Sequence, residues 1–188
     1  MTETSWKPSR EEVRAAEGAR VPDVIARGLK VLFCGINPGL YSGAVGHHFA
    51  RPGNRFWHAL EGAGFTDEVL SPFEERKLLE RGVGITNLVG RATARAEELS
   101  DAEMRGGLGA LTVKAARYEP RYVAMLGITA FRTAFGRRDV SVGPQEETIA
   151  KSRLWLLPNP SGLNAHYQVD DLAKLFGELR RAAFRDGG

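Results

Sequence analysis

The sequence contains one cysteine and no long apolar run, and each shortage excludes a class of protein. Cys34 has no partner for an intrachain disulfide, which favours a reducing cytoplasm. No apolar stretch approaches the length of a membrane-spanning helix. Residues 1–20 are too polar and too mixed in charge for a secretory signal. We expect a cytoplasmic protein, associated with the nucleoid if it is bacterial.

The phosphate-binding motifs of nucleotide enzymes are also missing. The stretch FCGINPGL (33–40) runs from a strand pattern into a glycine turn, yet no Gly-Lys-Ser/Thr follows it, and the dinucleotide fingerprint is absent. A metal site at His47 and His48 is disfavoured, because adjacent loop residues rarely bind one ion and no carboxylate or cysteine is placed to complete the shell. We therefore expect neither a metal nor an organic cofactor, and a nucleotide-binding enzyme is the weakest alternative.

The composition is that of one globular domain. The chain has 188 residues, of which 43% are hydrophobic and 26% charged. The net charge is only +3, but basic residues gather in expected loops. These residues are Arg51, Arg55, Arg91, Arg95, Arg137, Arg138 and Lys151. This placement suits either an anionic partner or an ordinary solvated surface.

Strand and helix patterns alternate along the chain, which predicts an α/β fold with a mainly parallel sheet. Residues 1–22 are expected to be an N-terminal extension, weakly structured or with a short helix capped by Ser9, and residues 23–188 a single domain. Strands are expected at 30–35, 83–89 and 121–127, with one or two more within 147–160. Helices are expected at 53–64, 72–82, 100–120, 128–136 and 168–184.

Three loops follow strands of this sheet: 35–55, 87–96 and 158–167. In parallel sheets, ligands bind beyond the carboxyl ends of the strands. We therefore expect the three loops to converge on one cleft.

The motifs in these loops are specific as a set. GINPGL, GHHFARPGNRFW and LPNPSGL occur in an order and separation that resemble the mismatch-specific uracil-DNA and thymine-DNA glycosylases of the uracil-DNA glycosylase superfamily. The resemblance runs from about Val24 to the last helix. It implies a three-layer α/β/α sandwich with a short central sheet, and excision of a flipped base from mismatched duplex DNA.

By this resemblance Asn37 is the residue that positions the attacking water. An amide oxygen can accept a hydrogen bond from water, but an amide cannot take up a proton, so turnover is expected to be slower than in members with Asp there. Capping of the turn before Pro38 is the structural alternative for Asn37.

The resemblance also assigns the base pocket. Phe49 would stack on the flipped pyrimidine, backbone groups of Ile36, Gly39 and Phe49 would contact its edges, and Ser42 would leave room at the C5 position. A core role for Phe49, and a purely structural role for His48 in place of one beside the base, stay open.

The second strand ends at Asn87, which is expected to reach the base or a phosphate. Family members usually carry an acid two or three residues later, where this chain has Gly90. An auxiliary general base is therefore not available at that position, and Asn37 is left as the main candidate. Arg91 and Thr93 are candidates for phosphate contacts.

The segment LPNPSGLNAHY resembles the loop that enters the duplex at the vacated position. Leu163 would be the intercalating residue, and apolar wedges of this kind offset the cost of unstacking. Its expected partners in DNA contact are Asn159, Ser161, Gly162, Asn164 and His166. A plain turn between the last strand and helix would use the same composition.

The sequence therefore predicts a monofunctional DNA glycosylase that acts as a monomer on double-stranded DNA containing mispaired uracil, with thymine and other 5-substituted pyrimidines as further candidate substrates. No lysine lies in these motifs as a nucleophile. The alternative is a non-catalytic mismatch-binding module with the same fold.

Overall fold

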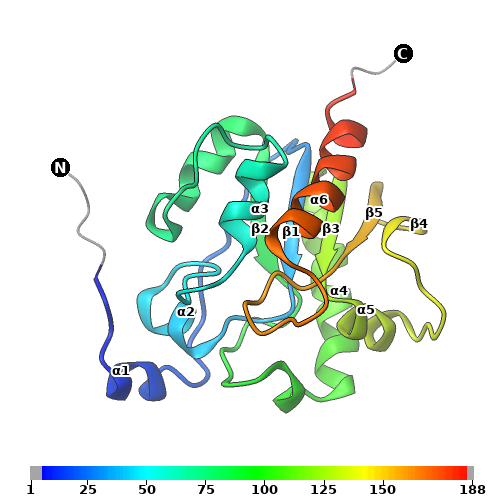
Figure 1. Ribbon diagram of the computed structural model, residues 1–188. Coiled ribbons are helices and arrows are strands. Elements are labelled where there is room, and N and C mark those ends of the chain that lie inside the picture. Colours follow the sequence, from blue (N-terminus) through cyan, green and yellow to red (C-terminus); the bar gives the residue numbers. More distant parts are fainter. Residues whose placement is uncertain (1–5, 186–188) are drawn as a thin grey trace.

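The computed structural model describes residues 6–185 (Figure 1), so residues 1–5 of the expected extension and 186–188 of the expected domain lie outside it. Five strands form one sheet in the order β2-β1-β3-β5-β4. All neighbours are parallel except β4 and β5, which are antiparallel at one edge. The strands are β1 (Val31–Gly35), β2 (Val83–Asn87), β3 (Tyr122–Leu126), β4 (Gly143–Ile149) and β5 (Ser152–Leu157).

Three of the helical segments begin at serine caps that the sequence pattern contains. The side chains of Ser9, Ser71 and Ser100 each accept a hydrogen bond from a backbone N–H of the first turn. A glutamate three residues later accepts the backbone N–H of the serine in return. The α-helices are α1 (Arg10–Ala15), α2 (Leu40–Val45), α3 (Phe56–Gly62), α4 (Asp101–Tyr118), α5 (Ile128–Phe135) and α6 (Val169–Ala183). Two 3₁₀ helices, η1 (Pro72–Arg81) and η2 (Ala96–Glu98), complete the set in residues 6–185.

The helices cover both faces of the sheet, which confirms the three-layer α/β/α sandwich. One layer, α3, η1 and α6, buries Phe56, Leu78 and Phe176 against strand residues that include Val31 and Phe33. The other, α4 and α5, packs residues such as Leu111 and Phe131 against Cys34, Val123 and Met125. Side chains alternate between the two faces along each strand, as the pleat requires.

The structure differs from the sequence-based expectation at three places. The loop expected at 35–55 contains the short helix α2. The strand before the last begins at Gly143, earlier than expected, because β4 is an edge strand and its first residues are too polar to mark a strand in the sequence. The helix expected at 72–82 is present between its Ser71 cap and Gly82, but it is a 3₁₀ helix.

The strand register brings the expected loops to one edge of the sheet. Gly35 pairs with Asn87 at the ends of β1 and β2, and Leu126 pairs with Leu157 at the ends of β3 and β5. The chain that leaves each of these positions therefore enters the same region. Among residues 6–185, no helix has the length and apolarity to cross a membrane.

Candidate active site

A cavity of about 510 Å³ lies at the carboxyl ends of the strands, a size typical of small-ligand sites. All three expected loops contribute to its lining, which confirms that they converge. The lining includes the expected residues Ile36, Asn37, Gly39, Ser42, His48, Phe49, Asn87, Asn159, Ser161, Leu163 and Asn164.

The end of β1 must be glycine for the cavity floor to form. A Cβ atom at Gly35 would lie 2.6 Å from Oδ1 of Asn87 and 3.3 Å from the ring of Phe49. The absence of a side chain lets both groups approach the backbone. Phe49 itself has a φ of +50°, and its ring packs on Phe56 with centroids 4.1 Å apart. Its carbonyl accepts a hydrogen bond from Nε1 of Trp57 at 3.2 Å, which helps to hold this left-handed backbone.

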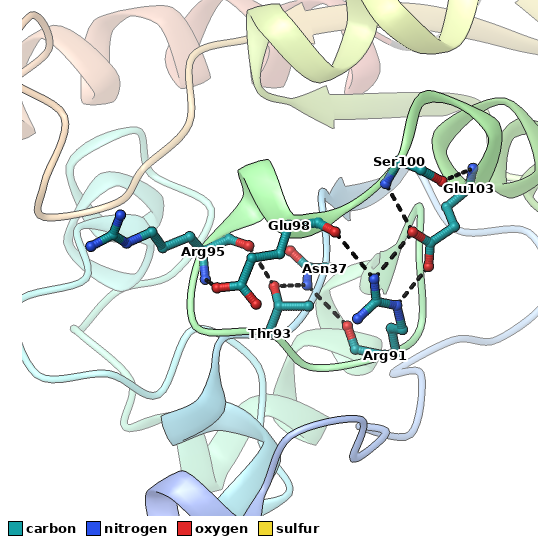
Figure 2. A network of polar contacts seen from close by, with 7 residues as sticks. All are labelled: Asn37, Arg91, Thr93, Arg95, Glu98, Ser100 and Glu103. Carbon is teal, nitrogen blue, oxygen red and sulfur yellow. Dashed lines mark hydrogen bonds and ion pairs between the residues drawn. The ribbon is translucent and has the colours of Figure 1, made fainter.

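The amide of Asn37 is held in one orientation (Figure 2). Its Nδ2 donates to the carbonyl of Arg91 at 2.9 Å and to Oγ1 of Thr93 at 2.8 Å. Thr93 gives its own proton to the carbonyl of Arg95, so its oxygen can act as the acceptor for Asn37. If the amide were flipped, Oδ1 of Asn37 would face the carbonyl oxygen of Arg91, and no hydrogen bond could form there. Oδ1 of Asn37 accepts no hydrogen bond from residues 6–185, and the side chain lines the cavity.

The guanidinium of Arg91 is not turned toward the cavity. It forms a two-pronged ion pair with Glu103, Nε at 2.6 Å and Nη2 at 3.1 Å, and also donates to the carbonyl of Glu98 (Figure 2). The hydrogen bond from Arg91 lowers the pKa of Glu103 to about 2, so the carboxylate stays ionised. Arg91 does not line the cavity, and its partners fix the loop whose carbonyl holds Asn37.

His48 fixes the second amide of the cavity, Asn87. His48 is 2% exposed, and its Nε2 lies 2.9 Å from the carbonyl of Pro22, which can only accept, so Nε2 bears the proton. Burial lowers the pKa of His48, which favours the neutral ring with a bare Nδ1. Nδ1 then accepts from Nδ2 of Asn87 at 3.3 Å. Oδ1 of Asn87 therefore points toward Gly35 at the end of β1.

A pH effect on stability follows from this burial. An unfolded chain protonates His48 at its ordinary pKa, whereas the folded protein keeps the ring neutral to lower pH. We expect the free energy of unfolding to fall as the pH drops from about 7.5 to about 5.5, and to fall less in His48→Gln. Urea unfolding of both proteins at the two pH values measures the difference. Equal losses would contradict the depressed pKa.

A buried carboxylate holds the segment that carries His48. Glu75 of η1 is 4% exposed; its Oε2 accepts the backbone N–H of His48 at 2.8 Å, and its Oε1 lies 2.9 Å from Nδ1 of His47. His47 also packs on Phe73, with ring centroids 4.7 Å apart. The two histidines therefore have different partners: His47 faces the carboxylate of Glu75, whereas the ring of His48 lies between Pro22 and Asn87. No cluster of three or more His, Cys, Asp or Glu side chains suited to a metal occurs in the described part of the chain.

The loop after β5 is organised by Arg55, the residue that precedes α3. Nη1 of Arg55 donates to the carbonyls of Asn164 and Tyr167, both at 2.7 Å, and more weakly to that of Ser161 at 3.4 Å. Nη2 donates to the carbonyl of Gly162 at 3.2 Å. Because one guanidinium serves four carbonyls, the loop keeps a defined shape. Leu163 lies 76% exposed within it.

The remaining expected residues are not all at the cavity. Gly162 lines a smaller adjoining hollow with Arg51, and His166 is exposed and lines neither. Ser42 is buried, and its hydroxyl oxygen accepts the N–H of Ala50 at 3.0 Å. A Cβ at Gly90 would lie 2.4 Å from Nη1 of Arg20, so the end of this long side chain would have to shift if a larger residue stood there. Burial raises the pKa of Cys34 to about 12, which keeps this thiol protonated in the core.

Several functional candidates were missed by sequence reasoning. Thr93 was considered only for phosphate contact, and Arg55 only as a loop charge. Glu75 carries a usable signal, because it precedes Leu78 and Leu79 by three and four residues and so shares their apolar face. Arg55 and Thr93 bond to partners distant in sequence, and no local pattern marks them.

The comparison with known families agrees with this geometry. A family model described as the uracil DNA glycosylase superfamily matches residues 22–182, most of the chain. Proteins of this superfamily are DNA-repair hydrolases that cleave N-glycosidic bonds in DNA. With its three-layer sandwich and its cavity at the strand ends, the chain belongs to the uracil DNA glycosylase superfamily.

Proposed function

We propose that the protein is a monofunctional, mismatch-specific uracil-DNA glycosylase, which leaves an abasic site in duplex DNA. The observation that carries this proposal is the oriented amide of Asn37. Both of its N–H groups are used within the protein, and its oxygen is left to accept a hydrogen bond in the cavity.

In the proposed reaction, a water molecule donates one hydrogen bond to Oδ1 of Asn37 and attacks C1′ of the deoxyribose. The new bond forms between the water oxygen and C1′, and the electron pair of the N-glycosidic bond leaves with the base. The water proton passes to solvent or to the departing base, because an amide cannot take it. Positioning of the water is then the main contribution of Asn37.

The flipped base would lie between Phe49 and the two amides. Phe49 offers an aromatic face at the cavity, and Oδ1 of Asn87 offers an acceptor, since its Nδ2 is bonded to His48. Uracil and thymine carry an N3–H donor, whereas cytosine has an acceptor at that position. An Asn87 held in this way supports the selection of uracil over cytosine.

The loop with Leu163 fits the role of a wedge. Leu163 lines the cavity and is 76% exposed, which leaves a large apolar side chain in water. Insertion into a base stack would bury it. Arg51 and Arg95 also line the cavity, and neither forms an ion pair within residues 6–185. We expect their charges to meet phosphates of the DNA backbone.

The activity is tested with a labelled duplex that contains one G·U pair. We expect abasic sites, detected as alkali-labile breaks in the uracil strand, without strand cleavage before the alkali treatment. Binding of the duplex without release of uracil would favour the alternative, a non-catalytic mismatch-binding module. A matched G·C duplex controls for background cleavage, and a G·T duplex tests the wider substrate range.

Thr93 provides a prediction on orientation. In Thr93→Val the shape is kept but Asn37 loses one of its two acceptors. We expect the single-turnover rate of uracil release to fall about fivefold, which corresponds to about 1 kcal/mol for one hydrogen bond. Thr93→Ser retains the hydroxyl and should recover most of the rate. Equal rates in the valine and serine variants would contradict the role of the hydroxyl.

A further inference from the structure

Residues 16–22 link α1 to the sheet. They contact both the loop that holds Asn37 and the histidine that holds Asn87. All but Pro22 lie outside the matched family region of residues 22–182. The N–H of Gly18 donates to the carbonyl of Ala92 at 2.9 Å, and the N–H of Ala92 donates to the carbonyl of Ala19 at 2.8 Å. The segment is thus joined to the loop after β2 by a reciprocal pair of backbone hydrogen bonds.

The contact is also closely packed. Gly43 of α2 faces both segments: a Cβ atom there would lie 2.9 Å from Cβ of Ala92 and 3.3 Å from both the carbonyl oxygen of Ala16 and Cβ of Ala19. Small residues on all three segments permit this approach, and Figure 1 shows α1 beside α2. A shift of the N-terminal segment would therefore be transmitted to Ala92.

Ala92 lies between the two residues that hold Asn37. Its neighbours Arg91 and Thr93 supply the carbonyl and the hydroxyl that accept from Nδ2 of Asn37. Thr93 is tied in turn to the motif of Asn37, since its N–H donates to the carbonyl of Pro38 at 3.1 Å. The position of Ala92 therefore sets the distance of both acceptors from the amide.

The end of the same segment serves the second amide. The carbonyl of Pro22 accepts from Nε2 of His48, which fixes the ring nitrogen that receives Asn87. Pro22 has no N–H and a restricted φ, so its carbonyl is presented by stiff backbone. One short segment thus holds partners of both Asn37 and Asn87.

We propose that residues 16–22 are a positioning element of the active site, which keeps the amides of Asn37 and Asn87 in their working orientations. The segment touches neither the base nor the water; it acts through Ala92 and His48. The inference deepens the proposed function and rests on it for its kinetic consequence, but the orientation of Asn37 can be measured without catalysis.

The test uses Gly18→Pro in the full chain, with Gly28→Pro as a matched control. Both glycines are exposed, have left-handed φ values of +76° and +72°, and have open space where a Cβ would lie. Each donates its N–H to a backbone carbonyl, that of Ala92 at 2.9 Å and that of Tyr118 at 2.8 Å. Proline removes the donor and cannot adopt either φ, yet only Gly18 is bonded to the loop that holds Asn37. Gly28 precedes the amino-terminal end of β1, away from the cavity.

We expect Gly18→Pro to lower the single-turnover rate of uracil release by about tenfold or more, because small displacements of catalytic groups are costly. The Kd for a duplex with a hydrolysis-resistant 2′-fluorinated deoxyuridine should change less than about twofold, since the DNA-facing residues are untouched. Gly18→Asn keeps the N–H and tolerates the left-handed backbone, so it should recover most of the lost rate. Gly28→Pro should keep the full rate.

The second readout is the side-chain amide pair of Asn37 in a ¹⁵N–¹H spectrum, identified by its loss in Asn37→Ala. In Gly18→Pro only, we expect the chemical shifts of this amide pair to move toward those of a free asparagine side chain, and its protons to exchange faster with solvent. An unmoved resonance, or equal rate losses in Gly18→Pro and Gly28→Pro, would overturn the inference. If the wild-type protein releases no uracil, the proposed function fails, and the resonance alone still decides the role of residues 16–22.

Discussion

Replacement of Asn37 by alanine is expected to lower the single-turnover rate of uracil release from a G·U duplex by about 10²- to 10³-fold, the range typical of the loss of one preorganised catalytic hydrogen-bonding group. The reason is geometric. The protein uses both N–H groups of this amide to aim its oxygen, so the alanine variant loses the only oriented acceptor proposed for the water.

The Kd for the 2′-fluorinated duplex separates this effect from loss of binding. We expect it to change little in Asn37→Ala, because Phe49, Asn87 and the loop with Leu163 are retained. The hydrogen bonds of Arg91 to Glu103 do not involve Asn37, so the loop should keep its fold. Unchanged release of uracil in this variant would refute the assignment of the water position.

Replacement of Arg55 is expected to have the second largest effect. Arg55→Met keeps an unbranched side chain but removes the donors to the carbonyls of four residues, Ser161, Gly162, Asn164 and Tyr167. The four carbonyls would then form hydrogen bonds with water instead. Because no single donor would hold them together, the loop would adopt several conformations. We expect release of uracil from the duplex to fall about 10²-fold, since a misplaced wedge no longer stabilises the flipped state.

Arg51→Met is the matched control, because it removes the same charge from a residue that lies beside the same loop without donating to its carbonyls. It should weaken DNA binding in a salt-dependent manner but leave the loop intact. Thermolysin cleavage near Leu163 reports the state of the loop directly: rapid in Arg55→Met, slow in Arg51→Met and in the wild type. Arg55→Lys should recover little, since an ammonium cannot bridge four carbonyls. Identical cleavage of the two methionine variants would show that Arg55 acts only as a charge.

The fold was largely predictable because its determinants are local. The capping pattern at Ser100 and the apolar run of β1 are each contained within a few consecutive residues, and each predicts its element correctly. The helix α2 was missed, since its six residues LYSGAV have neither a side-chain cap nor a clear apolar period. A polar edge strand such as β4 likewise lacks the apolar alternation that marks a half-buried strand.

Most of the residues that line the cavity could be named from the sequence, but the hydrogen bonds that hold them could not. Motif resemblance named Asn37, yet the acceptors that orient it lie 54 and 56 positions away. The same holds for Arg55, whose partners are more than 100 positions distant. Which groups meet across such distances depends on strand order and register, and no single-sequence pattern encodes it.

The hydrogen bond from Asn37 to the carbonyl of Arg91 also bears on how a faster enzyme of this kind can evolve. A single nucleotide change converts an asparagine codon to an aspartate codon and would place a side chain there that can take up a proton. In this loop, however, the new carboxylate oxygen would face a carbonyl oxygen, a repulsion that favours the protonated acid and so cancels the gain. If Asn37 positions the water as proposed, an aspartate at this position would therefore raise the rate only after the loop at Arg91 had changed, so the contacts that orient the amide also restrict which residue can replace it.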